Sequence, residues 1–182
     1  KKLKNFVLLV CSLFFYSWGE PRYVPIMLAS ILVNYAAGLG IKRFGHNRKV
    51  RVTLLVLSII FTMGMLFFFK YTNFFLSNLG ALLGTTFQPL DIALPLGISF
   101  YSFQIMSYTI DVYLGKVEAE KNIIDFGAFV VLFPQLIAGP IVRYADIETQ
   151  LRHRKVTSRR LGLGAVYFIT GLGKKVIIAN TI

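Results

Sequence analysis

Long apolar runs alternate with short polar or basic segments along this chain. A helix that spans a bilayer needs about 20 mostly apolar residues. Runs near that length are Leu3–Trp18, Tyr23–Ile41, Val52–Phe69, Leu94–Leu114 and Leu161–Ile182, of which the first is short. The pattern predicts an all-α fold, a polytopic transmembrane helical bundle.

Two further segments fit a simple span less well. In residues 72–93, phenylalanine and leucine recur at roughly helical spacing with asparagine and serine between them, which favours an interfacial or re-entrant helix. The apolar run Phe126–Val142 contains Pro134, Gly139 and Pro140, so we expect a broken helix there. Broken helices occur at membrane depth where the backbone is buried in protein or lines a cavity.

Charge and composition support the membrane interpretation. Apolar residues make up 55% of the chain, charged residues 15%, and the mean hydropathy is +0.65. The 20 lysines and arginines exceed the 8 acidic residues, for a net charge of +12. In a soluble protein this excess would suggest nucleic acid as a partner. Here the basic residues form short clusters between apolar runs, as the positive-inside rule describes, so we expect a bilayer and no nucleic acid.

The two basic clusters conflict with a simple count of spans. If the loop Lys42–Arg51 is cytoplasmic, the full spans that follow place the basic stretch 143–160 on the opposite side, against the positive-inside rule. The conflict disappears if residues 72–93 cross the membrane, or if Phe126–Val142 enters and leaves on one side. The prolines and glycine favour the second solution, which predicts a polar cavity within the membrane.

Four polar residues are candidates for function, because polar groups inside a membrane are costly and often functional. Gln104 and Asp111 share one face of a predicted helix. Gln135 follows a helix-breaking proline, and Arg143 could bind an anionic group. The structural alternatives are an Asp111–Lys116 pair at a helix end, a kink packed against neighbours, and an arginine that marks the end of a span.

The remaining reactive side chains carry less information. Lys174 and Lys175 lie in an apolar run, so either the helix breaks there or the lysines reach an anionic ligand. His46 and His153 lie among basic residues and are interpreted as solvated. No metal-ligand motif, catalytic triad or nucleotide-binding motif occurs in the sequence, and no metal is expected.

Four strings carry a resemblance to a known family. They are FYSWGEPRYVPIMLASILVNY (Phe15–Tyr35), PLGISFYSFQIMSYTIDVYLG within Leu94–Gly115, FPQLIAGPIVRY (Phe133–Tyr144) and GLGKKVIIAN (Gly171–Asn180). Together they resemble the membrane-bound O-acyltransferase family, and within it the alginate O-acetyltransferase branch. The resemblance covers nearly the whole chain, which would be the N-terminal half of a single such domain, cut at both ends.

The resemblance implies an enzyme of the bacterial cytoplasmic (inner) membrane. Such an enzyme moves an acyl group, typically acetyl, from a donor such as acetyl-CoA or an acyl carrier to a polysaccharide such as alginate. It works with periplasmic or extracytoplasmic partner proteins and holds no resident cofactor. The family's essential histidine would lie beyond Ile182, so no catalytic residue is assigned here and the chain alone should be inactive. Gln104, Asp111, Gln135 and Arg143 would line the channel or contact the donor.

Two other classes of function remain open at this point. A transporter or flippase component also uses broken helices and polar residues near the midplane. A non-catalytic assembly subunit would need no chemistry of its own.

Overall fold

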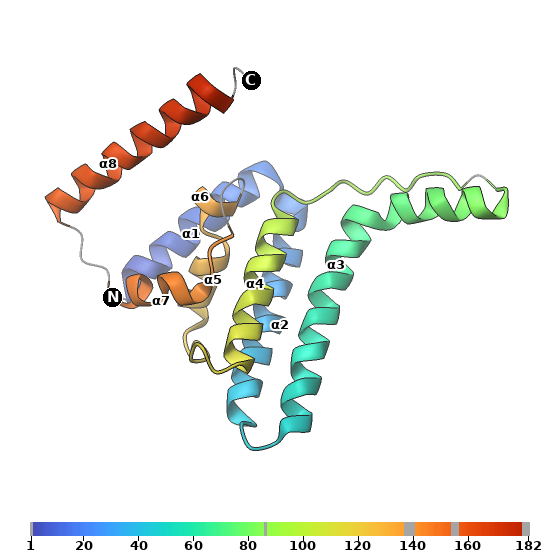
Figure 1. The fold of residues 1–182 in the computed structure, drawn as a ribbon, viewed down its shortest axis with the longest axis horizontal. Helices are drawn as coiled ribbons and strands as arrows, with labels where there is room; N and C mark the ends of the chain where they lie inside the picture. Colours follow the sequence, from blue (N-terminus) through green and yellow to red (C-terminus); the bar gives the residue numbers. More distant parts are fainter. Residues whose placement is uncertain (1, 86, 137–140, 154–156, 180–182) are drawn as a thin grey trace. The chain divides into compact units, whose positions relative to one another are not determined.

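The computed structural model describes residues 2–85, 87–136, 141–153 and 157–179. Every regular element in these ranges is helical, as the sequence predicted (Figure 1). Within the described ranges, three helical stretches are long and apolar enough to cross a membrane: Pro21–Arg43, Arg48–Leu83 and Ser158–Ala179. The chain is therefore a multi-pass membrane protein. It divides into two compact units, Lys1–Leu151 and Arg152–Ile182.

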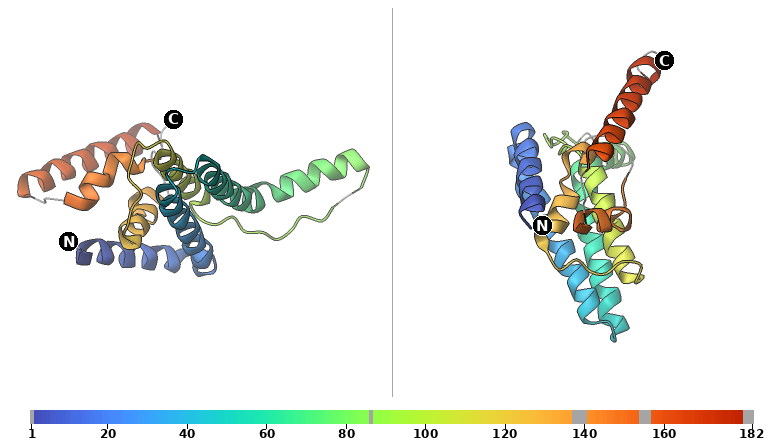
Figure 2. Two further views of the ribbon diagram at one scale, coloured as in Figure 1. Left: turned by 90° about the horizontal axis from the view of Figure 1, so that it is seen from below. Right: turned by 90° about the vertical axis from the view of Figure 1, so that its left-hand side faces the viewer.

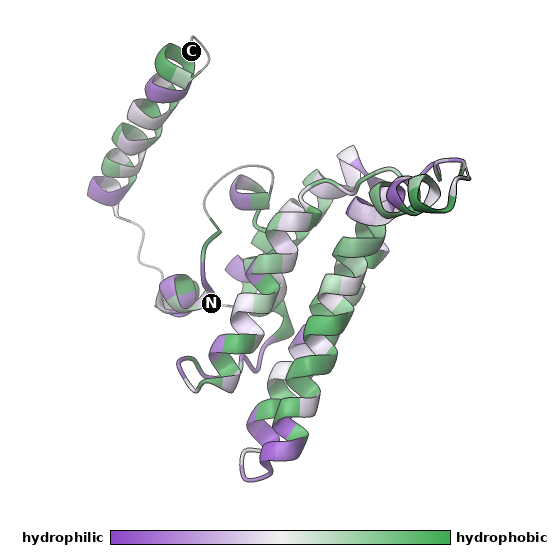
Figure 3. Ribbon diagram, turned by 45° about the vertical axis from the view of Figure 1, so that its right-hand side comes forward, coloured by the Kyte–Doolittle hydropathy of each residue, from purple (hydrophilic) through white to green (hydrophobic). Residues whose placement is uncertain are grey.

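The first unit starts with two helices joined by a tight turn. Helix α1 (Lys2–Gly19) ends before Glu20, and a short 3-10 turn, η1 (Pro21–Tyr23), leads into α2 (Val24–Arg43). Proline suits this place because the first turn of a helix needs no backbone N–H donor. Helix α2 ends in the basic turn that the sequence predicted, which lies at the hydrophilic end of the α2–α3 hairpin (Figure 3).

Helix α3 (Arg48–Leu83) is much longer than the predicted span Val52–Phe69. Its 36 residues correspond to about 54 Å, against about 30 Å for a hydrocarbon core. The helix changes direction in its C-terminal half, and the last turns form an arm that extends away from the other helices (Figures 1 and 2). The Thr72 hydroxyl donates to the Phe68 carbonyl at 2.7 Å, a contact that favours bending. Residues 72–83 thus form the helix expected there, as a continuation of α3.

The chain then returns along the arm as an extended segment. The Asn73 side chain exchanges two hydrogen bonds with the backbone of Leu90, both at 2.9 Å. Helix α4 (Ile98–Tyr113) begins later than the predicted Leu94. Gly97 precedes it with a φ of 69°, a conformation that interrupts helix and suits glycine. The helix has 16 residues, about 24 Å, so the predicted full span was too long.

Helices α2, α3 and α4 pack side by side, with polar contacts between them. Fully buried Asn34 of α2 donates to the Thr62 hydroxyl of α3 at 3.1 Å and accepts from the Thr109 hydroxyl of α4 at 3.1 Å. At Gly38 a Cβ atom would lie 2.8 Å from the Tyr108 hydroxyl, so glycine allows α2 and α4 to approach closely. One asparagine therefore joins three helices.

The run Phe126–Val142 is broken, as predicted. Helix α5 (Ile123–Val130) ends, and the single turn α6 (Phe133–Leu136) follows, so the described residues form no spanning helix here. Pro134 explains the break, because it cannot donate to the Val130 carbonyl that a continuous helix would offer it. The predicted breaks at Gly139 and Pro140 lie outside the described residues. Residues 126–131 are buried, as a broken segment inside a membrane requires.

Helix α7 (Tyr144–His153) returns the chain to the side from which α5 started. The Tyr144 hydroxyl donates to the Glu120 carboxylate at 2.5 Å, just before α5 begins. Asn5 of α1 donates to Asp125 at 2.8 Å and to the Leu151 carbonyl at 3.1 Å, which joins the start of α5 to the end of α7. The segment between Glu120 and Tyr144 thus leaves and returns to one side of the bundle.

That side carries the basic α2–α3 turn. Lys42 pairs with Glu118 at 2.7 Å, and Arg51 donates to the Tyr113 carbonyl at 2.5 Å, so the loop after α4 lies beside the turn. Arg143, at the start of α7, can then face the cytoplasm together with the basic turn, without a further crossing by residues 72–93. Of the two solutions to the charge conflict, these contacts favour the re-entrant one.

The second unit is one long helix. Helix α8 (Ser158–Gly173) is capped by Thr157, whose hydroxyl accepts from the Arg160 N–H at 3.3 Å. At Lys174 the helix widens into a π-helical stretch, η2 (Lys174–Ala179). The lysine pair therefore does not end the helix but coincides with a local change in its winding, a feature often found at functional sites.

Candidate functional site

Gln104, the first predicted site residue, is buried and has a structural partner. Its amide donates to the Phe129 carbonyl at 3.0 Å. Phe129 lies in the last turn of α5, where the break leaves carbonyls without a helical N–H partner. Gln104 thus satisfies a carbonyl that the broken helix exposes.

Asp111 and Arg143 lie towards the side of the basic turn. The Asp111 carboxylate is nearly buried and approaches the Lys116 ammonium at 3.9 Å, which is the structural alternative considered for it. Arg143 is exposed, and its carbonyl accepts from the Asp146 N–H at the start of α7. Neither residue converges with Gln104 on a common point in the described contacts. Gln104 and Asp111 are both buried on α4, as their helical spacing predicts, but they contact different partners.

Gln135 behaves differently, because its side-chain oxygen is buried without a hydrogen bond to any described residue. The hydroxyls of Tyr16 and Tyr101, which are 1% and 0% exposed, share this property. We call these two residues the tyrosine pair. Most buried polar groups in folded proteins have a partner, so such groups require an explanation.

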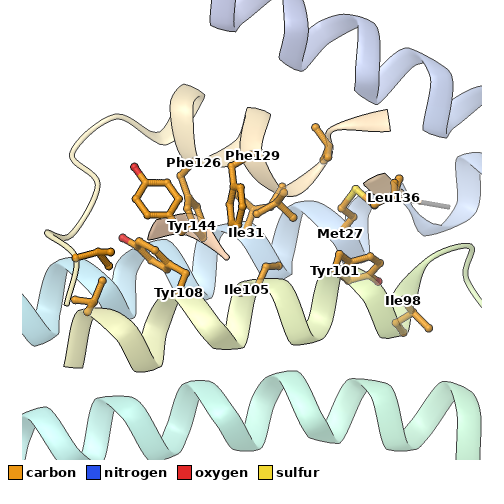
Figure 4. Close-up of a cluster of buried hydrophobic side chains, with 14 of the residues drawn as sticks. Met27, Ile31, Ile98, Tyr101, Ile105, Tyr108, Phe126, Phe129, Leu136 and Tyr144 are labelled. Carbon is orange, nitrogen blue, oxygen red and sulfur yellow. The ribbon is translucent and has the colours of Figure 1, made fainter. Parts of the chain in front are cut away.

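The tyrosine pair lies at the end of the bundle remote from the basic turn. The phenols of Tyr16 and Tyr101 lie near each other and near Glu20, whose carboxylate accepts from the Leu96 N–H at 3.1 Å. Figure 4 shows the Tyr101 ring beside Met27, with Ile98 and Leu136 nearby. The pair therefore belongs to the region where α1, α4 and the turn before α4 meet.

Gln135 lies on α6, which packs against the same region. The ring centroids of Phe15 and Phe133 lie 5.5 Å apart, which places α6 against α1. The Leu136 carbonyl packs so tightly on Gly97 that a Cβ there would lie 2.3 Å from its oxygen. Helix α6 thus contacts both α1 and the start of α4, the two elements that carry the tyrosine pair. The region combines two hydroxyls with an amide oxygen and a carboxylate.

The tyrosine pair was not predicted from the sequence. A tyrosine in an apolar helix is typical of an interfacial aromatic or of core packing. One feature could have indicated it, because the tripeptide Phe-Tyr-Ser occurs at both positions, Phe15–Ser17 and Phe100–Ser102.

The sequence analysis also did not single out Glu120, whose carboxylate is buried and accepts several hydrogen bonds. Its carboxylate accepts from the Tyr144 hydroxyl and from the N–H groups of Lys121 and Asn122, at 2.9 and 3.0 Å. The ring of Tyr144 packs edge-on against Tyr108, 5.1 Å between centroids. This network holds the two ends of the re-entrant segment together.

The other residues considered do not form a site in the described structure. His46 is exposed in the turn between α2 and α3, and the side chain of His153 lies outside the described atoms. Among the described residues, no group of three or more histidine, cysteine or acidic side chains is placed to hold a metal ion. Two surface cavities, of about 460 and 450 Å³, are lined by α3 and the segment that follows it, and neither contains a predicted site residue.

Known proteins resemble this chain along its whole length. It is 38% identical to the probable alginate O-acetylase AlgI of Pseudomonas aeruginosa, over all of this chain and 36% of that protein. The corresponding protein of Azotobacter vinelandii is 37% identical, over all of this chain and 37% of its own length. A peptidoglycan O-acetyltransferase of Helicobacter pylori is 34% identical, over 95% of this chain and 38% of that protein. No family model and no solved structure matches.

Proposed function

We propose that this chain, a homologue of the alginate O-acetylases along its whole length, forms part of a membrane enzyme that transfers acyl groups to a polysaccharide. These relatives confirm the resemblance to the alginate branch of the membrane-bound O-acyltransferases. The chain spans about a third of their length, so the activity belongs to a larger protein. The observation that carries the proposal is this whole-length similarity to proteins named for O-acetyl transfer.

The acceptor side of the reaction is proposed to lie at the tyrosine pair. Acyl transfer brings together a carbonyl and a hydroxyl. The carbonyl can accept a hydrogen bond from a phenol O–H, and the hydroxyl can donate to an amide oxygen or a phenol oxygen. Tyr16, Tyr101 and Gln135 supply these groups in a buried place, where their hydrogen-bonding capacity is not used by the described residues. A hydrogen bond is stronger in such a low-dielectric place than in water.

The donor side is proposed to lie towards the basic turn, which the positive-inside rule places in the cytoplasm. Arg143 is exposed at the start of α7 and could hold the phosphate groups of acetyl-CoA or of a carrier. Asp111 and Gln104 shape this half of the bundle through Lys116 and Phe129. Of the four predicted site residues, we retain Gln135 and Arg143 as substrate contacts.

The chemistry itself needs a base for the acceptor hydroxyl. By the resemblance, a histidine outside these 182 residues supplies it, and the residues described here orient the substrates. The enzyme is proposed to reside in the bacterial inner membrane and to reach its polysaccharide through extracytoplasmic partner proteins. The present residues alone should be inactive.

The proposal is tested with Tyr101→Phe and Tyr16→Phe in the full-length protein, by the transfer of labelled acetyl to exopolysaccharide. Each change keeps the ring and removes a hydroxyl that has no partner in the described structure, so the stability should not fall. If the hydroxyls contact the reacting groups, acetyl transfer should fall by about tenfold or more.

Controls separate this role from a structural one. Tyr144→Phe should lose stability, because its hydroxyl binds Glu120. Unchanged acetyl transfer in both Tyr16→Phe and Tyr101→Phe would remove the tyrosine pair from the site. A full-length protein that needs no histidine outside this chain would instead favour the transporter or assembly alternatives.

A further inference from the structure

Helix α3 carries an apolar groove on its exposed face, in the part that crosses the membrane. The groove has a volume of about 450 Å³ and is lined by Ile60, Met63, Gly64, Leu66, Phe67 and Tyr71. Gly64 leaves the space open, because no atom lies within 4 Å of the place where its Cβ would be. Apart from the Tyr71 hydroxyl, the lining side chains are apolar. The groove therefore suits a slender apolar ligand.

Its depth in the membrane follows from the helix geometry. From Ile60 to Tyr71 the helix rises about 16 Å, roughly half of a 30 Å hydrocarbon core. From the basic residue Arg51 to Lys70 the rise is about 28 Å, close to the whole core. The groove therefore occupies the leaflet remote from the basic turn, and Lys70 lies at the level of the headgroups.

A cation stands at the headgroup end of the groove. The Lys70 ammonium lies 5.5 Å from the centroid of the Tyr71 ring, which lines the groove. Lysine at this depth extends towards the interface, where its ammonium can pair with a lipid phosphate. An apolar chain below a phosphate matches this arrangement in both shape and charge.

We propose that the groove binds an acyl chain of a phospholipid whose phosphate lies against Lys70. The site is separate from the tyrosine pair and does not depend on the proposed acetyl transfer. Its ligand is a lipid of the surrounding bilayer, held at the place where α3 bends into the arm.

Native mass spectrometry of the full-length protein, released from its membrane, tests the proposal by counting retained phospholipid. Lys70→Gln removes the charge and should lower retention by about two- to fivefold, as expected for the loss of an exposed ion pair. Gly64→Leu fills the groove and should lower it to a similar degree. The matched controls are Lys49→Gln, at the opposite end of the span, and Val56→Phe, which adds bulk outside the groove; both should retain lipid. Equal retention in all four variants would overturn the proposal.

A photo-reactive phenylalanine analogue at Phe67 gives an independent readout in intact membranes. Phe67 is half exposed and lines the groove, so irradiation should attach phospholipid to it. A cross-link to another stretch of the same protein, or to a second copy, would show a protein segment in the groove and overturn the lipid assignment. Lys70→Gln should reduce the lipid adduct, while Lys49→Gln should leave it unchanged.

Discussion

Gly97 lies where the backbone of α6 packs against the start of α4, and its replacement by alanine tests how firmly the broken segment is held there. Gly97 has a φ of 69°, and an added Cβ would lie 2.3 Å from the Leu136 carbonyl oxygen. Gly84, at the end of α3, is a matched control. Its φ of 66° is nearly the same, but no atom lies within 4 Å of its Cβ position.

Both replacements lower the free energy of unfolding through the same backbone strain, and they differ in how the added Cβ packs. A left-handed conformation costs a residue with a Cβ about 1–2 kcal/mol more than glycine. At Gly84 this should be the whole loss of unfolding free energy. At Gly97 the overlap adds about 1–3 kcal/mol, for a total of roughly 2–5 kcal/mol. The upper part of that range is expected, because Leu136 presents a backbone carbonyl that cannot rotate away as a side chain would.

The assay is unfolding of the full-length protein in detergent, with both variants compared to the unmodified protein under the same conditions. Gly97→Ala should lose clearly more stability than Gly84→Ala. Acetyl transfer should also fall in Gly97→Ala, because α6 carries Gln135. Equal losses in the two variants would show that α6 is not held against α4, and the described position of Gln135 would have no support.

Three further outcomes are expected. Asn34→Leu removes the two hydrogen bonds from Asn34 to α3 and α4. Because such a bond contributes about 0.6 kcal/mol in a membrane, the free energy of unfolding should fall by about 1 kcal/mol. A loss beyond about 3 kcal/mol would contradict this. Tyr144→Phe takes a donor from a buried carboxylate and should cost about 1.5–3 kcal/mol, measured in the same way, whereas no loss would argue against the closed re-entrant segment. In a Cys11→Ser background, single cysteines at Lys121 and Asp146 should react with a membrane-impermeant thiol reagent from the same side, and opposite sides would refute the re-entrant arrangement.

Much of the fold could be predicted, because hydrophobic runs and helix punctuation act locally. The predicted span Tyr23–Ile41 corresponds closely to α2, and Pro134 marked the break after α5. The length of α3 could not be predicted, since asparagine and serine at 73–78 are compatible with both a helix and a loop. The late start of α4 depends on the φ of Gly97, which its contact with α6 stabilises and which no local pattern reveals.

The candidate site was harder to predict, because the partners of a polar side chain come from distant segments. Gln104 and Asp111 looked functional by their position on one helix face, but the structure gives both of them structural partners. Tyr16 and Tyr101 looked like ordinary membrane aromatics, yet their hydroxyls are among the buried polar atoms that no described residue satisfies, together with those of Ser12, Arg51, Ser102 and Gln135. Hydrophobic pattern cannot distinguish these cases, since it reports burial and not hydrogen bonding.

The break after α5 positions polar groups at both ends of the bundle. On the basic side, the ends of the re-entrant segment are tied by Glu120 and Tyr144, and Gln104 satisfies a carbonyl that the break exposes. On the remote side, α6 brings Gln135 towards the tyrosine pair of α1 and α4, where no described residue completes its hydrogen bonds. A fold that needed these groups only for stability would gain by replacing them with apolar residues of similar shape. This cost supports the substrate contacts proposed above for the tyrosine pair and Gln135.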